Sequence, residues 1–277
     1  GEVQTSDIYR ALIRNYAKLD YESVGTWLEG TGPMPAGVAR VPEMEDQLHL
    51  QDQAADRLRA MRQRKGALDL ETVEASPVTE HGSIIDLKVT RKNRARYLIE
   101  EFMVAANSAM ASFLEAKGSL VIQRVVRTPE RWPRIVEIAE SLGDSLPAQL
   151  DSRALADFLA RRKQADPDHF PDLSLSVVKL LGSGEYAVLQ AGAKPEGHFG
   201  LAAQDYTHST APNRRFVDLV TQRLLKAVIA GKALPYKIDE LTRIAQHCTE
   251  RDKAAKKVER KMRKVAAVVL LAGRLGE

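Results

Sequence analysis

Two adjacent arginines, Arg214 and Arg215, follow the polar turn HSTAPN. The apolar spacing after this turn predicts a helix over 212–230 with Thr210 as its N-cap. Both guanidinium groups would then lie at the positive end of the helix dipole, where each like charge is unfavourable by about 0.3–1 kcal/mol. Backbone N–H groups and forked guanidinium groups at a helix start bind phosphate oxygens well. The pattern therefore predicts a phosphate-binding site; the alternative is that both arginines are solvated or paired with Asp218.

Glu100 is a second candidate, within a predicted helix over 92–117. Apolar side chains fill most of the circumference of this helix, so we expect it to be buried in the middle of the domain. Asn107 follows Glu100 by two turns on the same face. A carboxylate near a core needs an ion pair, a hydrogen bond or a water-filled cleft. A site role is therefore one interpretation, and a structural ion pair to Arg94 or Arg96 is the other.

Glu259 lies in a predicted final helix over 237–275, inside a charged run between Glu250 and Lys264. Lysine and arginine dominate this run. Such a run is usually a solvated helix face with ion pairs between residues four apart. The alternative is that these side chains line a path for phosphate groups.

An acidic cluster contains Asp166, Asp168, His169 and Asp172. Carboxylates and a histidine are possible metal ligands. The cluster lacks helical spacing and contains prolines, which favours a solvated loop. We therefore assign it no metal.

The composition is that of a globular protein. The 277 residues suffice for one large or two ordinary domains with a sizeable core. The net charge of +4 permits a nucleic-acid partner without requiring one. The single cysteine, Cys248, excludes an internal disulfide and a cysteine-based zinc site and is typical of a reducing compartment. Without a signal peptide or a run of about 18 apolar residues, we expect a cytoplasmic protein with no membrane role.

The elements that must position the candidates alternate between helices and strands. Large apolar and basic side chains alternate over 8–18, which predicts an early strand with a basic face. A polar turn at Glu80 predicts a hairpin between its two flanking strands. Further helices are expected over 21–30, 42–65, 129–142 and 151–163, and strands over 67–73, 83–89 and 120–126; residues 186–190 form either a short strand or a helix turn.

These residues together resemble the catalytic RNB domain of the ribonuclease II and ribonuclease R family. Thr210 opens the segment that carries the strongest resemblance, and the likeness implies that it contacts RNA. Four segments match in order and spacing: YESV and WLE at 21–29; IEE, Met103 and AAN at 99–107; HFGL, Tyr206, TAPNRR, Asp218 and RL at 198–224; and the two ER pairs at 250–251 and 259–260.

The resemblance implies an activity and a role for each candidate. The family hydrolyses RNA processively from its 3′ end and releases nucleoside 5′-monophosphates with magnesium. By this likeness, Arg214 would hold a phosphate near the scissile bond, and Arg215 would support the same anionic channel. Glu259 would help to clear the cleaved nucleotide or position the 3′ end. Tyr21 and Glu100 would position the final nucleotides.

Two departures from the family pattern concern the metal and the terminal base. The family holds its metals on an aspartate-rich loop that precedes the matching region, and the scattered Asp86, Asp151 and Asp205 do not replace it. We therefore assign no metal ligand in this chain and expect the Mg²⁺ ligands outside it. An aliphatic residue near Leu70 stands where the family has a phenylalanine that stacks on the terminal base.

The fold class that follows is α+β: an RNB catalytic-domain fold, with a mixed sheet or barrel surrounded by long helices, incomplete at its N-terminal side. Residues 1–277 would be the C-terminal portion of a single RNB catalytic domain, without the OB-fold domains and the aspartate-rich loop. The expected partners are single-stranded RNA and the remainder of the same domain, in a monomer. The alternatives are a non-catalytic single-stranded-RNA-binding module of this fold, or a helical scaffold with no RNA role.

Overall fold

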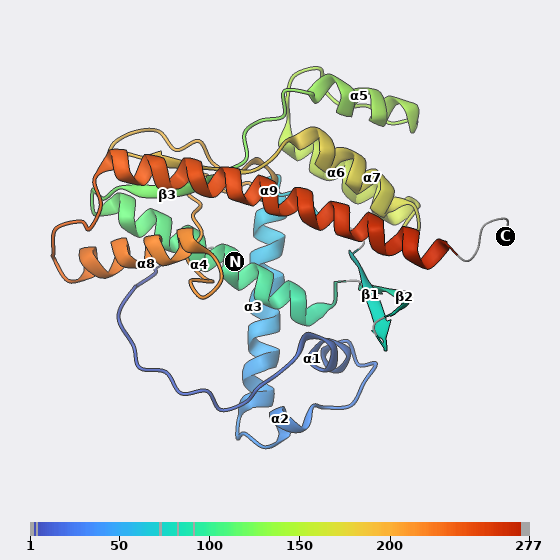
Figure 1. Ribbon diagram of the computed structural model, residues 1–277, viewed down its shortest axis with the longest axis horizontal. Coiled ribbons are helices and arrows are strands. Elements are labelled where there is room, and N and C mark those ends of the chain that lie inside the picture. The colour runs from blue at the N-terminus through green and yellow to red at the C-terminus, as the bar shows by residue number, and fades with distance from the viewer. Residues whose placement is uncertain (1–2, 4, 72–73, 82, 91, 273–277) are drawn as a thin grey trace.

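The computed structural model describes residues 3, 5–71, 74–81, 83–90 and 92–272. In chain order the elements are α1 (Tyr21–Leu28), α2 (Ala36–Ala39), α3 (Met44–Arg64), β1 (Glu74–Glu80), β2 (Ser83–Thr90), α4 (Arg94–Ala116), β3 (Val121–Val125), α5 (Trp132–Ser141), α6 (Ser152–Ala165), α7 (Phe170–Leu181), β4 (Glu185–Leu189), a 3-10 turn (Phe199–Leu201), α8 (Phe216–Ile229) and α9 (Ile238–Leu271). In the view of Figure 1, α4 lies at the centre, between α8 and the long helix α9.

The strands form two separate antiparallel pairs, β1 with β2 and β3 with β4. The β3–β4 pair is regular, from Val121 opposite Leu189 to Val125 opposite Glu185. All five residues of β3 are buried, so this strand lies inside the protein rather than at its surface.

Two hydrophobic clusters form the core. The first lies between α4, β3, β4, α8 and α9, and the second between α5, α6 and α7. Buried side chains of the first cluster are Ala111, Leu114, Val121, Ile122, Leu189, Val217, Val220, Leu224, Leu225, Leu241 and Ala245. The candidate residues of the TAPNRR segment therefore border the first cluster, through α8.

Helix α4 forms where a helix was predicted, but it is less buried than predicted. Its buried residues recur at intervals of three and four, including Leu98, Val104, Ala111 and Leu114. Ile99 and Met103, on another face, are exposed. The helix is thus buried along one broad stripe, and the prediction that it is buried all round was wrong.

Two predicted strands are absent from the described residues. Residues 8–18 lie in an irregular segment, because a strand needs a partner for its N–H and C=O groups and no described strand runs beside it. The first strand of the hairpin begins at Glu74 instead of residue 67. Leu68 and Leu70 pack against the second cluster, and the Leu68 N–H donates to the Gly200 carbonyl at 3.0 Å. These two leucines therefore pack in the hydrophobic core and do not belong to a strand of the hairpin.

Helix α7 was not expected. It begins at Phe170 with Pro171 in its first turn, where the missing N–H has no intrahelical partner to lose. Asp172 also lies in this first turn, at the favourable end of the helix dipole. Asp166, just before it, binds the His169 ring at 2.9 Å. The acidic cluster therefore spans the end of α6 and the first turn of α7, and none of its side chains caps α7 by a hydrogen bond.

Candidate functional site

Residues 208–215, here called the signature loop, lead into α8. The helix begins at Phe216, and Arg215 is its N-cap residue with extended backbone angles. The prediction that Thr210 caps the helix was wrong, because residues 212–214 form a separate turn. The Thr210 hydroxyl is buried and makes no hydrogen bond to the described residues. The Thr210 hydroxyl therefore faces the interior of the protein.

The two arginines of the loop have different surroundings. The Arg215 guanidinium donates to Asp218 Oδ1 at 2.7 Å, and the Asp218 side chain is 0% exposed. The same oxygen accepts the Ala211 N–H at 2.8 Å. Arg214 is exposed, and no described carboxylate forms an ion pair with it. The predicted alternative, pairing with Asp218, is thus confirmed for Arg215, whereas Arg214 keeps its charge free for a partner.

Two further side chains hold the loop against its neighbours. The backbone N–H and the hydroxyl of Ser209 both donate to Asn107 Oδ1 of α4, at 3.0 and 2.8 Å. From α8, the Gln222 amide donates to the Ser209 carbonyl at 2.9 Å. Asn107 and Ser209 are both buried. The loop is therefore fixed to α4 by buried hydrogen bonds and to α8 by a partly buried one.

A row of aromatic rings, one buried and three half-buried, extends from His208, the first residue of the loop. His208 packs edge-on against both Tyr186 and Tyr206, and Tyr206 packs edge-on against His198. Burial lowers the pKa of His208 to about 3, helped by the charges of Arg215 and other nearby groups. Burial also lowers the pKa of His198 to about 4. Both rings are thus neutral at pH 7, which suits packing rather than acid–base chemistry.

Tyr21 and Glu100 lie near the N-terminal half of α4. Tyr21 is the first residue of α1, and its ring lies 4.8 Å from the Arg96 guanidinium carbon. The Tyr21 carbonyl accepts a hydrogen bond from the Asn93 amide at 2.6 Å. The Glu100 carboxylate is 34% exposed and accepts from the Lys92 ammonium at 2.7 Å. The expected partners of Glu100, Arg94 or Arg96, were wrong, and its ion pair lies at the surface.

The buried carboxylate of α4 is the neighbour of Glu100. Glu101 is 3% exposed at its side chain and forms a forked ion pair with Arg62 of α3. The position of a carboxylate on a helix rotates by about 100° per residue, so adjacent glutamates face different surroundings. Sequence periodicity alone did not select between them.

Glu259 projects from α9 into solvent. Its side chain is 57% exposed and accepts a hydrogen bond from Arg263, one turn later, at 2.5 Å. The predicted pattern of ion pairs between residues four apart is thus confirmed at this position.

The structure groups the six candidates on three parts of the fold. Tyr21 and Glu100 belong to α1 and the first half of α4, and Glu259 belongs to α9. The signature loop carries the other three. Asn107 links the Tyr21 and Glu100 group to the signature loop, since it holds the loop and follows Glu100 by seven residues, or ~10 Å along the same helix.

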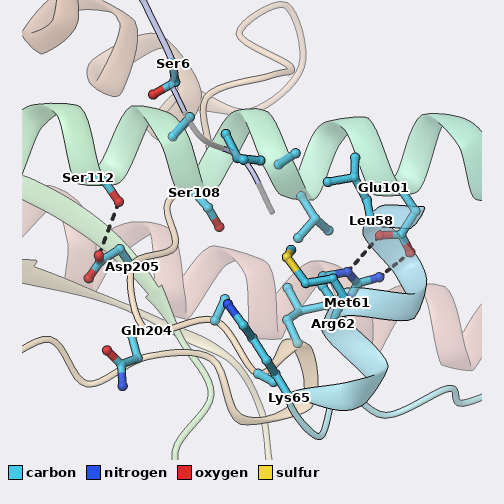
Figure 2. Close-up of a pocket in the computed structure, with 17 residues that line it drawn as sticks. Ser6, Leu58, Met61, Arg62, Lys65, Glu101, Ser108, Ser112, Gln204 and Asp205 are labelled. Carbon is cyan, nitrogen blue, oxygen red and sulfur yellow. Dashed lines mark hydrogen bonds and ion pairs between the residues drawn. The ribbon is translucent and has the colours of Figure 1, made fainter. Parts of the chain in front are cut away.

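A cavity of about 690 Å³ lies elsewhere, between α3, α4 and residues 201–205. Figure 2 shows Lys65 just after the end of α3, Ser108 and Ser112 on α4, and Gln204 and Asp205 on the loop around it. None of the six candidates lines this cavity. The predicted site and this hollow are therefore different places.

The described residues contain no group of three or more His, Cys, Asp or Glu side chains that could hold a metal ion. The nearest approach is a pair beside the cavity: Asp205 accepts from the Ser112 hydroxyl at 3.2 Å and lies near Glu115. Burial, and then the charge of Asp205, raises the pKa of Glu115. Two carboxylates are fewer than the several that must converge on a two-metal site.

Sequence comparison places these features among known proteins. The model of the RNB domain family matches residues 1–231. Ribonuclease R 1 of Lactococcus lactis is 30% identical over 288 residues, and ribonuclease R of Thermotoga maritima is 30% identical over 287 residues. Each alignment covers 100% of this chain but only 34% and 39% of the relatives. The chain thus spans well under half the length of these curated relatives.

Solved structures give the same fold. The apo form of Mycoplasma genitalium RNase R has a TM-score of 0.79 at 24% identity and covers 93% of this chain and 40% of its own. The same protein with double-stranded RNA has a TM-score of 0.78, covering 93% and 46%. Yeast Ssd1, described as a pseudonuclease, has a TM-score of 0.56 at 22% identity and covers 73% and 25%. The predicted α+β fold is therefore confirmed.

Proposed function

Since the chain belongs to the RNB domain family, we propose that it is part of the catalytic domain of a 3′-to-5′ exoribonuclease. The substrate is single-stranded RNA, and the products are nucleoside 5′-monophosphates. The curated relatives named ribonuclease R support the reaction class. The Mycoplasma genitalium protein has been solved with double-stranded and with ribose methylated single-stranded RNA, which supports RNA as the partner.

The exposed Arg214 carries this proposal. It lies on a loop that buried hydrogen bonds hold in place, beside an Arg215 whose charge Asp218 already neutralises. A rigidly presented guanidinium with no internal partner is suited to bind a phosphate oxygen through two parallel N–H groups. In the proposed reaction, Arg214 stabilises negative charge on the phosphate next to the scissile bond.

The other candidates take supporting roles in the proposal. Tyr21 and Glu100 position the last nucleotides, since an aromatic ring can stack on a base and a carboxylate can accept from a ribose hydroxyl. Glu259 repels the monophosphate product or positions the 3′ end. Thr210 and Arg215 support the phosphate path from within the signature loop.

Magnesium belongs to the proposal only through residues outside this chain. The described residues contain no group of three or more His, Cys, Asp or Glu side chains that could hold the ion. The assignment of residues 1–277 to the C-terminal portion of one RNB domain, the monomeric state and the cytoplasmic location stay predictions. In the described part of the chain, no helix has the length and apolar character needed to span a bilayer.

A non-catalytic single-stranded-RNA-binding module is the second candidate function. The lack of a metal cluster in the described residues is compatible with it, as it is with metal ligands outside this chain. The fold is compatible with it too, because Ssd1 shares the fold and is described as a pseudonuclease. Such a module would bind RNA with a steep dependence on salt but would not cleave it.

Hydrolysis of 5′-labelled oligo(A) with Mg²⁺ distinguishes the two. We would compare the 277-residue chain with the same chain joined to those segments of the Lactococcus lactis relative that lie outside the match. The enzyme proposal expects mononucleotide release by the joined protein and none by the 277 residues alone. Salt-sensitive binding with no cleavage by either protein would support the binding module. Cleavage by the 277 residues alone would contradict the placement of the metal ligands outside the chain.

A further inference from the structure

Arg124, in the middle of β3, is a buried arginine with contacts on several sides. Its backbone N–H donates to the Tyr206 carbonyl at 2.8 Å, which ties β3 to the segment before the signature loop. Its guanidinium lies 4.7 Å from the centre of the Tyr186 ring on β4. Nη2 donates to Asp252 Oδ2 of α9 at 3.1 Å. One side chain therefore contacts both the neighbouring strand and the long helix.

Tyr186 extends this contact to the signature loop. Its hydroxyl lies 2.9 Å from His208 Nδ1, the first residue of the loop. Burial raises the pKa of Tyr186 and keeps its hydroxyl protonated, so the hydroxyl can donate to the neutral His208 ring. The Tyr186 backbone N–H also donates to the Thr249 hydroxyl of α9 at 2.9 Å. The Arg124–Tyr186 pair thus lies between α9 and the loop and contacts each of them.

The contact between Arg124 and Asp252 can fix the rotation of α9, and with it the direction in which Glu259 points. Glu259 follows Asp252 by seven residues, two helical turns or ~10 Å along the same face of α9. A helix that is fixed at Asp252 is therefore fixed in rotation at Glu259. On the other side, His208 is six residues before Arg214 in a loop already held by Asn107 and Asp218.

We propose that Arg124 is a positioning residue that sets the Glu259 face of α9 relative to the signature loop and its Arg214. The inference rests on the proposed function, because it assigns the two parts to one reaction. Lysine cannot replace this residue, since a single ammonium cannot both stack flat on Tyr186 and donate sideways to Asp252. Loss of the guanidinium geometry frees α9 and the loop together.

Gly184 offers a way to move Arg124 without changing any charge. A Cβ atom at Gly184 would lie 2.8 Å from Arg124 Nε and Nη2, closer than real contacts allow. The φ angle of Gly184 is outside the left-handed region, so alanine is not strained by its own backbone. Gly184→Ala therefore displaces the guanidinium by sterics alone.

Hydrogen exchange of the 277-residue chain tests the coupling without any RNA. In Gly184→Ala and Arg124→Lys, amides of both 206–215 and 250–262 should exchange at least about tenfold faster, the factor for loss of one hydrogen bond to a charged group. Tyr186→Phe should accelerate the loop alone, and Asp252→Asn should accelerate α9 alone. Arg127→Lys is the matched control, an exposed arginine paired with Glu185 just after β3, and should change neither segment.

Acceleration of only one segment in Gly184→Ala, or of neither, would overturn the coupling. If Gly184→Ala does not fold, Arg124→Lys decides it by the same criterion, acceleration of both segments against one or neither. The catalytic part is tested in the joined protein, where Arg124→Lys should lower kcat at least about tenfold while RNA affinity without Mg²⁺ changes less than twofold. An unchanged kcat with coupled exchange would reject the positioning role, whereas a wild-type protein without hydrolysis would reject the proposed function.

Discussion

Replacement of the two neighbouring arginines, one at a time, should have opposite consequences. Arg215→Ala leaves the Asp218 carboxylate, 0% exposed, without its cationic partner. Breaking a buried pair costs about 3–5 kcal/mol. Because the Arg215 side chain is 28% exposed and Asp218 keeps the Ala211 N–H, we expect the low end, about 3 kcal/mol. That is a large share of the ~5–15 kcal/mol that stabilises a domain.

Arg214→Ala removes an exposed side chain with no described ion pair, so the free energy of unfolding should change by less than about 0.5 kcal/mol. Its effect should appear in RNA binding instead. Loss of one phosphate contact lowers the slope of log K against log salt by about 0.7 for a single strand. In the joined protein, kcat should fall by roughly a hundredfold or more, as for the loss of one donor to a developing anion.

Urea unfolding and fluorescence anisotropy with oligo(A) at several salt concentrations measure these effects. Arg214→Lys is the control, since it keeps the charge and the salt slope but loses the paired N–H geometry. Equal destabilisation by the two alanine variants would refute the reasoning from Asp218. An unchanged salt slope in Arg214→Ala would refute the phosphate contact.

Three other predictions follow from burial and charge. The pKa of His208 is lowered from 6.5 to about 3, so its contribution to stability is complete above pH 6.5 and is lost as the pH falls. The free energy of unfolding in urea should therefore be lower at pH 5 than at pH 7 by up to about 2 kcal/mol because of this residue. His208→Gln should show a smaller difference between the two pH values. Glu101→Ala should cost about 3–5 kcal/mol and Glu100→Ala less than about 1 kcal/mol, which thermal unfolding checks; equal costs would contradict the assignment of the buried pair. Glu259→Ala should leave unfolding within about 0.5 kcal/mol and, in the joined protein, slow product release, seen as slower steady-state turnover than single turnover.

The local elements follow from local sequence. Periodic apolar residues and terminal glycines predict the helices α1, α3 and α4, because a helix satisfies its own hydrogen bonds within a few turns. Gly30 and Gly66 follow two of these helices with positive φ, as a C-terminal glycine should. The strand expected at 8–18 does not form. A strand, unlike a helix, needs hydrogen-bond partners on a neighbouring strand, and the local sequence does not show whether such a strand lies beside it.

Motif spacing also predicts which segments carry the site, since the resemblance names the signature loop, α4 and α9. It does not predict how those segments are joined. Asn107 was noted beside Glu100, but its bond to Ser209 depends on the packing of two segments about 100 residues apart. Arg124 and Tyr186 gave no signal in the sequence, because their contacts with Asp252 and His208 all cross between elements.

The sequence by itself determined the family, the helices and the presence of two arginines at the start of α8. Only the tertiary structure decided that Arg215 is bound to Asp218 while Arg214 pairs with no described carboxylate, and that Glu101 rather than Glu100 is the buried carboxylate of α4. The physical reason is that the charge available for chemistry depends on which partners and how much water surround a side chain. Neighbours in the chain share a residue type but not an environment.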